Sequence, residues 1–330
     1  MPVPMPVPPV PPVTILTGDR PTGPLHLGHY FGTLANRVRL QREGADLFVL
    51  VADYQVLTDR DVADRLTEHV EGLVADYLAV GIDPGAATIF QHSAVPALNQ
   101  LMLPFLSLVS VAELRRNPTV KEEIEVSGQA TVSGLMFTYP VHQAADILFC
   151  KADLVPVGKD QLPHQEVARL IARRFNERYG PVFPVPDALL SDTPNLLGTD
   201  GRKMSKSRGN AIALSASPDE TARLIKGART DAERHITYEP DTRPEVSNLV
   251  RLAALCQGRD PRLVAEEIGG GGAAALKKVV IESVNEFLRP IRARRAALDR
   301  GELRRVLRRG NERANEVADR TLAEVRAVMT

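Results

Sequence analysis

The sequence is poor in cysteine and has no long apolar run. Its two cysteines, Cys150 and Cys256, are far apart and form no CxxC pair. This excludes a disulfide framework and is typical of a reducing compartment, so we expect a cytoplasmic protein. Two thiols cannot supply the four ligands of an iron–sulfur cluster. No stretch reaches bilayer length and there is no secretory pattern, so we expect no membrane contact.

Net charge is also absent. The 41 lysines and arginines balance 41 aspartates and glutamates over 330 residues. No overall field therefore draws the molecule to nucleic acid, and any such contact must come from a local patch. With 44% hydrophobic and 25% charged residues, the composition is that of an ordinary globular protein. Its length allows a large core and two domains.

Short apolar runs alternate with helical patterns in the first part of the chain. We expect strands at 13–16, 45–52 and 87–91, and another from 154 that breaks at Gly158. Helices are expected at 31–40, 61–80, 96–112, 138–148 and 165–179, with a charged loop at 113–121. This alternation predicts an α/β fold with a Rossmann-like doubly wound parallel sheet, whose ligands lie at the carboxyl ends of the strands.

Residues 201–210, with the sequence GRKMSKSRGN, form a polar segment bounded by glycines. The ammonium groups of Lys203 and Lys206 are three residues apart, among serine hydroxyls and free backbone N–H groups. Such a surface loop suits a polyphosphate, because negative charge builds up on the leaving oxygens during transfer. A solvated basic loop is the alternative.

A second motif lies near the N-terminus, between the first strand and the first helix. It places His26, Gly28 and His29 where the helix begins, after the turn that contains Gly23. A strand, a glycine turn and a helix start point backbone N–H groups and the positive helix end at a phosphate. Half of a zinc site is the alternative, but the chain offers no matching thiolate pair, so we expect no zinc.

The two motifs together resemble the paired signatures of class I aminoacyl-tRNA synthetases. His-Leu-Gly-His at 26–29 is similar to the first signature, and Lys-Met-Ser-Lys-Ser at 203–207 matches the second letter for letter. The resemblance covers about residues 14–328 and is closest to the tryptophan-specific members. Tyr-Pro-Val at 139–141, Ala-Ala-Asp at 144–146 and Val-Pro-Val-Gly-Lys-Asp-Gln at 155–161 carry that part of the resemblance.

The resemblance implies a two-step reaction. L-tryptophan reacts with ATP to give tryptophanyl-adenylate, and the amino acid then passes to the 3′ end of tRNA(Trp), with release of AMP and pyrophosphate. Mg²⁺ would be bound through the ATP phosphates. The family also implies a homodimer. Positioning and charge neutralisation should supply most of the catalysis.

The resemblance also implies three sets of site residues. The catalytic set is His26, His29, Lys121, Lys203 and Lys206. The ATP-binding set is Arg20, Pro21, Thr22, Gly28, His29, Leu197, Gly158, Lys159, Asp160, Lys203, Met204, Ser205, Lys206 and Ser207. The tryptophan-binding set is Asp146, Tyr139, Gln143, Val155, Val157, Gln161, Leu16 and Gln55.

The spacing of Tyr139, Gln143 and Asp146 puts all three on one helix face, with Pro140 in the first turn. A surface stripe is the alternative to a lined pocket. Indole has one N–H donor and no acceptor, so an ionised Asp146 carboxylate is its natural partner. The common bacterial pattern differs at Leu16, Gln55, Gln143 and residues 20–23, which leaves the pocket contacts and the inhibitor sensitivity open.

The expected domains follow from the same pattern. Residues 1–13 form a disordered proline-rich arm, and 14–200 form the Rossmann catalytic domain. Residues 201–330 carry the lysine loop and a helical tRNA anticodon-binding domain, whose last helix can pack back on the catalytic domain. Residues 269–272 are interpreted as a flexible connector. Ten arginines crowd residues 289–313, as an RNA contact or as a solvated face.

Three alternative functions remain open at this stage. One is a tyrosyl-tRNA synthetase, since a phenol O–H can also donate to Asp146. Another is a synthetase-like RNA-binding or regulatory protein that charges no tRNA. The third is a small-molecule nucleotidyltransferase, which would not need the arginine-rich helical tail.

Overall fold

The computed structural model describes residues 12–58, 65–118, 120–121, 133–158, 162–190 and 196–330. The proline-rich arm predicted at 1–13 lies outside these ranges except for its last two residues. Lys159, Asp160 and Gln161 of the predicted site also lie outside them. Among the described residues, no helix is both long enough and apolar enough to cross a membrane.

Five parallel strands form one sheet in the order β3-β2-β1-β4-β5. They are β1 Thr14–Asp19, β2 Asp46–Val51, β3 Ala87–Gln91, β4 Leu154–Val157 and β5 Asp187–Leu190. β1 lies in the centre, and Ile15 pairs with Leu47 on one side and with Leu154 on the other. The predicted α/β parallel sheet is confirmed. β5 was not predicted, because its four residues directly follow the proline-rich run at 181–186.

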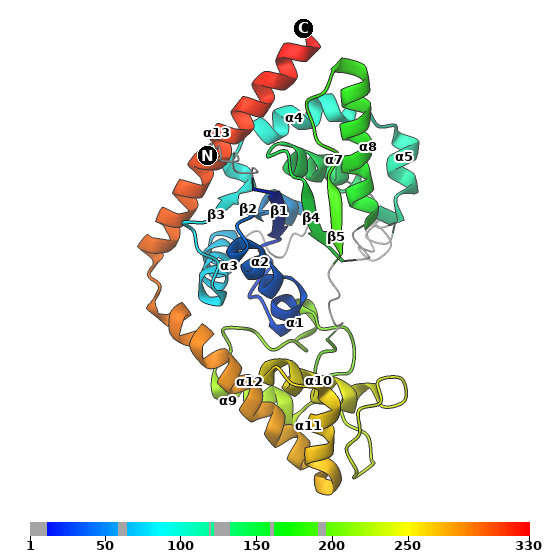
Figure 1. The fold of residues 1–330 in the computed structure, drawn as a ribbon, viewed down its shortest axis with the longest axis vertical. Coiled ribbons are helices and arrows are strands. Elements are labelled where there is room, and N and C mark those ends of the chain that lie inside the picture. Colours follow the sequence, from blue (N-terminus) through cyan, green and yellow to red (C-terminus); the bar gives the residue numbers. More distant parts are fainter. Residues whose placement is uncertain (1–11, 59–64, 119, 122–132, 159–161, 191–195) are drawn as a thin grey trace, which may run out of the picture.

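Helices cover both faces of the sheet (Figure 1). On one face lie α1 Leu27–His29, the π-helical turn η1 Tyr30–Leu34, α2 Ala35–Arg42 and α3 Leu66–Val80. The other face carries α4 Ala97–Leu106, α7 Gly134–Leu148 and α8 Leu162–Tyr179. Because side chains alternate along a strand, Ile15 of β1 enters the first core and Leu16 enters the second.

Several boundaries differ from those expected, and three of them bear on the predicted site. The first helix begins at Leu27 and not at 31, so both motif histidines lie at its start. α5, Val111–Arg116, occupies the expected charged loop, because Ser110 and Glu113 form a capping box. α7 begins at Gly134, where Ser133 Oγ accepts the Met136 N–H, so Pro140 lies inside the helix and not in its first turn.

The C-terminal part is helical, as predicted. It comprises α9 Pro218–Lys226, α10 Pro244–Gln257, α11 Pro261–Ile268, α12 Gly272–Ala297 and α13 Arg300–Met329. Each of the first three helices has a proline in its first turn, where the missing N–H costs nothing. The glycine run forms a short 3-10 turn, Gly269–Gly271, that leads directly into α12.

The last helix runs along the edge strand of the sheet (Figure 1). α13 approaches β3 so closely that a Cβ on Gly310 would lie 1.8 Å from the Ile89 carbonyl oxygen. Only glycine fits there. The Asn311 side chain accepts the Gln91 N–H at 2.8 Å, and Thr321 donates to the Phe149 carbonyl at 2.7 Å. α13 therefore covers an edge that would otherwise be open to pairing with other chains.

Most of the arginines in the expected RNA-contact cluster bind the protein itself. Arg295 pairs with buried Asp76 at 2.8 Å, and Arg300 and Arg304 both pair with Glu71. Others contact α3 or residues near the sheet: Arg294 donates to the Ala79 carbonyl, Arg309 to the Pro84 carbonyl, and Arg313 to Asp46. These arginines fasten α12 and α13 to α3 and to residues near the sheet. The sequence pattern had left them open between an RNA contact and a solvated face.

Candidate active site

The two motifs meet in the structure. The His26 backbone bridges to Ala213, the Leu27 N–H donates to the Ile212 carbonyl at 3.0 Å, and the Leu214 N–H donates to the Leu25 carbonyl at 2.9 Å. The Lys206 ammonium reaches back to the Gly23 carbonyl at 3.0 Å and to Thr22 Oγ1 at 3.4 Å. The histidine turn and the lysine loop thus line one site.

Gly28 lies beneath two side chains at this junction. A Cβ added at Gly28 would lie 3.0 Å from the His26 ring and 3.4 Å from the sulfur of Met204. The first contact is tighter than side chains normally tolerate. In this structure, therefore, the missing side chain makes room for His26 and for Met204 of the lysine loop. The glycine lets the two motifs pack together.

Both motif histidines are neutral. Burial lowers the pKa of His26 to about 3, and the neighbouring His29 and Lys206 lower it further. Burial likewise lowers the pKa of His29 to about 4. The His26 N–H donates to His29 Nδ1 at 3.2 Å, so the proton of the His29 ring lies on Nε2. Neutral imidazoles of this kind can still donate an N–H to a phosphate oxygen.

The Lys206 ammonium is largely buried, and two acids lie near it. Burial lowers the pKa of Lys206, while Asp19 and Asp76 oppose that shift. Burial by itself would raise the pKa of Asp19, but Arg37 outweighs it and leaves the pKa well below its usual value. The Tyr77 hydroxyl also donates to Asp19, at 2.7 Å. Asp19 therefore stays ionised behind the site.

Asp76 connects the histidine turn to the helical domain. Its Oδ2 accepts the Leu25 N–H at 2.9 Å, and its Oδ1 accepts Nε of Arg295 at 2.8 Å. Leu25 directly precedes His26, whereas Arg295 lies on α12. The sequence interpretation missed Asp76 because it lies within α3, where an acidic residue is expected to face solvent.

Asn210 holds the lysine loop in shape. It is 2% exposed, and its Oδ1 accepts the Ser205 N–H at 2.8 Å. Its Nδ2 donates to Asp200 at 2.7 Å and to the Lys203 carbonyl at 3.2 Å. One side chain therefore satisfies three groups of a loop that lacks regular structure. The glycine and asparagine that end the motif were the available signal in the sequence.

The predicted tryptophan-binding residues gather on the α7 face of the sheet. Leu16, Val155 and Val157 are buried in the same core as the inner face of α7. The Tyr139 hydroxyl lies 3.0 Å from Nε2 of His164 on α8. Gln143 is half-buried, and Asp146 is completely buried. Gln55 lies in the 3-10 turn Tyr54–Thr58 that follows β2. The predicted helix face is thus an inward face.

The surroundings of Asp146 do not favour the ionised carboxylate that we expected. Its burial, and secondarily the charge of Asp53, raise its pKa well above the usual value. Nε2 of His92 lies 3.0 Å from Asp146 Oδ1. Burial also lowers the pKa of His92 well below its usual value, so this histidine supplies no positive charge. Both shifts favour the protonated form of Asp146.

The other predicted residues are placed as follows. Lys121 is exposed on a helical turn after α5, Gly158 is exposed at the end of β4, and Lys203 is exposed on its loop. Arg20 is exposed, Pro21 is buried and Thr22 is half-buried. The backbone N–H and carbonyl of Leu197 both bind the Asn248 side chain, at 2.8 and 3.0 Å. An adenine ring would have to compete with Asn248 for those backbone groups.

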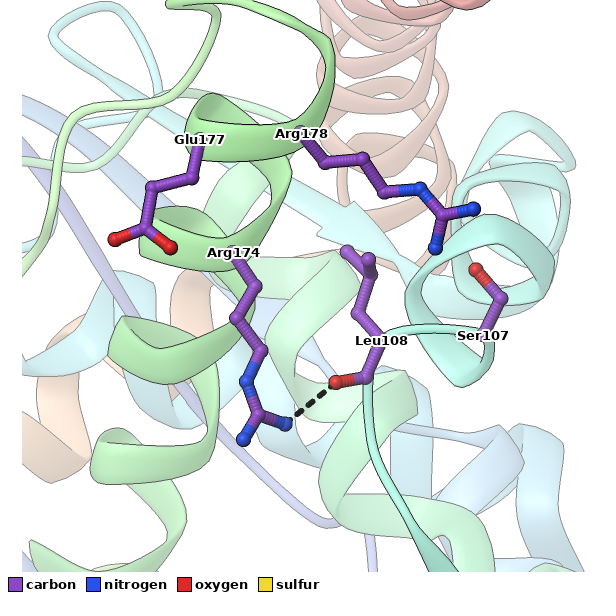
Figure 2. A pocket seen from close by; sticks show the side chains of 5 residues that line it. All are labelled: Ser107, Leu108, Arg174, Glu177 and Arg178. Atoms are coloured by element: carbon purple, nitrogen blue, oxygen red, sulfur yellow. Dashed lines mark hydrogen bonds between the residues drawn. The ribbon is translucent and has the colours of Figure 1, made fainter.

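Two surface hollows lie apart from this junction. Figure 2 shows one of about 320 Å³ between α4 and α8, where Arg174 donates to the Leu108 carbonyl at 2.6 Å. The other, of about 400 Å³, lies between α2 and α12 and includes Arg39, Arg42 and Arg294. Neither hollow contains a residue of the predicted site.

Known proteins match this chain across the regions that carry both motifs. Residues 10–289 match the family model described as tRNA synthetases class I (W and Y). The tryptophan–tRNA ligase of Treponema pallidum (strain Nichols) is 42% identical over 333 residues, 96% of each chain. That of Streptococcus pyogenes serotype M1 is 42% identical over 332 residues, 96% of this chain and 97% of its own.

A solved structure gives a similar result. The tryptophanyl-tRNA synthetase of Campylobacter jejuni, crystallised with ADP and tryptophan, superposes with a TM-score of 0.83 at 29% identity. The match covers 95% of this chain and 98% of that one. The similarity therefore extends through the sheet and the helical region alike.

Proposed function

This chain belongs to the family of class I tRNA synthetases for tryptophan and tyrosine, and on that premise we propose that it is a tryptophan–tRNA ligase. Its relatives at 42% identity carry that activity in their names, and the structural neighbour was crystallised with tryptophan. The observation that carries the proposal is the junction of the two motifs. Lys206 and the histidine turn lie within hydrogen-bonding distance of each other, at the carboxyl end of β1.

The reaction has two balanced steps. A carboxylate oxygen of tryptophan attacks the α-phosphorus of ATP, which arrives as its magnesium complex, and the bond to the β-phosphate oxygen breaks. Pyrophosphate leaves with the electron pair of that bond. A ribose hydroxyl at the 3′ end of tRNA(Trp) then attacks the adenylate carbonyl, gives up its proton and displaces AMP.

The protein contributes position and charge. His26 and His29, as neutral donors, are assigned to the phosphate oxygens, while Lys206 neutralises charge on the departing pyrophosphate. Burial of the Lys206 ammonium strengthens its attraction for an anion. Lys203 and Lys121 are exposed and can approach the phosphates when the nucleotide enters. Met204 and Gly28 keep the two motifs in contact.

The amino acid is assigned to the other face of the central strands. Leu16, Val155 and Val157 form apolar walls. Asp146 supplies the hydrogen-bond acceptor that an indole N–H requires. Tyr139, Gln143 and Gln55 surround the same region as polar neighbours. The adenylate carbonyl then lies between this pocket and the histidine turn.

Two macromolecular partners complete the proposal. The helical domain is assigned to the anticodon of tRNA(Trp), through arginines that are left exposed, such as Arg305 and Arg308.

The contact surface for a second copy of this chain is assigned to α4 and α5. Leu103 is 73% exposed and Val111 is 58% exposed, although both are large apolar side chains on adjacent helices.

Amino-acid-dependent exchange of pyrophosphate into ATP, followed by charging of tRNA(Trp), tests the proposal directly. Purified protein should support both reactions with tryptophan and neither with tyrosine at equal concentration. Exchange with tyrosine alone would instead assign the chain to the tyrosine branch. Absence of exchange with either amino acid would make it a synthetase-like protein that charges no tRNA.

A further inference from the structure

Two buried imidazoles lie behind Asp146. His92 follows β3 at the start of a 3-10 turn, His92–Ala94, and is completely buried. Its ring stacks on His142 of α7, with centroids 3.9 Å apart and 28° between the planes. His142 in turn lies 2.9 Å from the Asn99 side-chain oxygen through Nε2. The stack therefore fixes the plane and the height of the His92 ring.

His92 and Asp146 carry polar atoms that the described protein leaves unsatisfied. Nε2 of His92 and Oδ1 of Asp146 are 3.0 Å apart, but their angle is not that of a hydrogen bond. Among the described residues, Nδ1 of His92 and Oδ2 of Asp146 also have no hydrogen-bond partner. Leaving buried polar atoms unpaired is costly, so their presence at a binding site indicates a ligand that completes them.

Asp53, the other carboxylate in this region, is already engaged. Asp53 accepts the Ser93 N–H at 2.9 Å and the Tyr54 N–H at 3.1 Å. Tyr54 lies 5.4 Å from the His92 ring and 6.2 Å from the His142 ring, measured between centroids. Asp53 is thus not available to bind an indole. Of these two carboxylates, Asp146, with His92 beside it, is the one that remains as an acceptor.

We propose that His92, held by its stack on His142, positions Asp146 so that one oxygen binds the imidazole and the other accepts the ring N–H of the amino acid. The inference rests on the proposed function, since it takes the ligand to be tryptophan. One proton lies between Nε2 and Oδ1, and a rotation of the Asp146 carboxyl group aligns it with the fixed imidazole. The pair stays neutral overall, so an indole N–H meets an oriented acceptor without an unpaired buried charge.

The position of this proton predicts that the site distinguishes tryptophan from an analogue of the same shape that lacks the ring N–H. Tryptophan should be preferred over β-(3-benzothienyl)-L-alanine, which has the same shape but carries sulfur in place of the ring N–H. A site that must pair a buried acceptor rejects such an analogue strongly, here by about 100-fold or more. His92 is a positioning residue in this scheme. Its substitution should lower the affinity for tryptophan and leave that for the analogue unchanged.

The experiment compares dissociation constants of both amino acids, by isothermal titration calorimetry, for four proteins. These are the wild type, His92→Met, His92→Gln and Asp146→Ala. His92→Met keeps the volume and removes the polar group, and it should reduce the preference for tryptophan roughly tenfold. His92→Gln keeps a hydrogen-bonding group, donor or acceptor, toward Oδ1 and should retain the preference within about threefold. A merely structural role of His92 would lower both affinities together.

The outcomes separate this inference from the proposed function. If Asp146→Ala leaves the preference unchanged, Asp146 does not recognise the ring N–H and the assignment of the pocket is wrong. If Asp146→Ala abolishes the preference while His92→Met preserves it, only the role of His92 is overturned. Should His92→Met fail to fold, His142→Ala removes the stack and keeps both polar groups. It should cut the preference several-fold, and an unchanged preference would refute the role of His92.

Discussion

The ammonium nitrogen of Lys206 lies 3.0 Å from the carbonyl oxygen of Gly23. These residues are 183 positions apart in the chain. The contact joins the lysine loop to the turn before His26. In the proposed reaction, a triphosphate would displace the carbonyl and take its place beside the ammonium. Under that proposal, the contact already holds the lysine where its charge would be needed, which lowers the cost of positioning it.

Lys206→Ala should slow tryptophan-dependent pyrophosphate exchange by about 100- to 1,000-fold, because charge on the leaving group loses a buried partner. The dissociation constant for tryptophan should change little, since Lys206 lies outside the proposed indole pocket. Lys278→Ala, at an exposed position on α12, is the matched control. An unchanged exchange rate in the Lys206 variant would refute its assigned role.

Asn210→Ala should loosen the lysine loop, because the Ser205 N–H and the Asp200 carboxylate both lose a buried partner. We expect a loss of about 1–3 kcal/mol in the free energy of unfolding and a slower pyrophosphate exchange. Urea unfolding and exchange kinetics measure the two effects. Asn36→Ala, whose side chain binds Arg39 on the surface of α2, should change neither.

Arg295→Ala should destabilise the protein through Asp76. The carboxylate stays buried and keeps only the Leu25 N–H, so the free energy of unfolding should fall by about 2–3 kcal/mol. Exchange should slow as well, since Leu25 precedes His26. Arg289→Ala, which breaks an exposed pair with Glu286, should leave the free energy of unfolding nearly unchanged. Equal losses in the two variants would contradict the role of Asp76.

Stability should depend on pH through His142. Burial lowers the pKa of His142 to about 4 from an ordinary value of 6.5. Between these values the unfolded chain binds a proton that the folded protein does not, so the free energy of unfolding falls as pH falls from 6.5 toward 4. His142→Phe should reduce that decline by on the order of 2 kcal/mol. Denaturant unfolding at a series of pH values compares the slopes, and equal slopes would be the contrary result.

Leu103→Glu should convert a dimer to a monomer, because a charge on the exposed apolar part of α4 opposes its burial against a second copy. Analytical ultracentrifugation measures the change. Leu263→Glu is the matched control, since that leucine is likewise exposed, at 51% against 73% for Leu103, but lies on α11. A wild-type protein that sediments as a monomer would contradict the assembly.

The sequence predicted the order of the elements well because each signal was local. Apolar runs identified four of the five strands, and β5 was missed because a proline-rich run precedes its four residues. The capping box at Ser110 and Glu113 was present in the sequence, yet the surrounding charges suggested a loop. The charges favour a loop and the capping hydrogen bonds favour a helix. Here the capping hydrogen bonds outweigh the charges.

The sequence alone determined the chemistry of the two motifs and the helix face that carries Asp146, because both depend on residue type and short spacing. Only the tertiary structure decided how those groups are held. Asp76, Asn210 and the stacked His92 and His142 become visible when elements far apart in the chain meet. The raised pKa of Asp146 also becomes visible only in the tertiary structure, and so does the pairing of the arginines of α12 and α13 with buried acids. The physical reason is that burial and long-range pairing set both pKa values and hydrogen-bond partners, and neither is encoded in any short stretch of sequence.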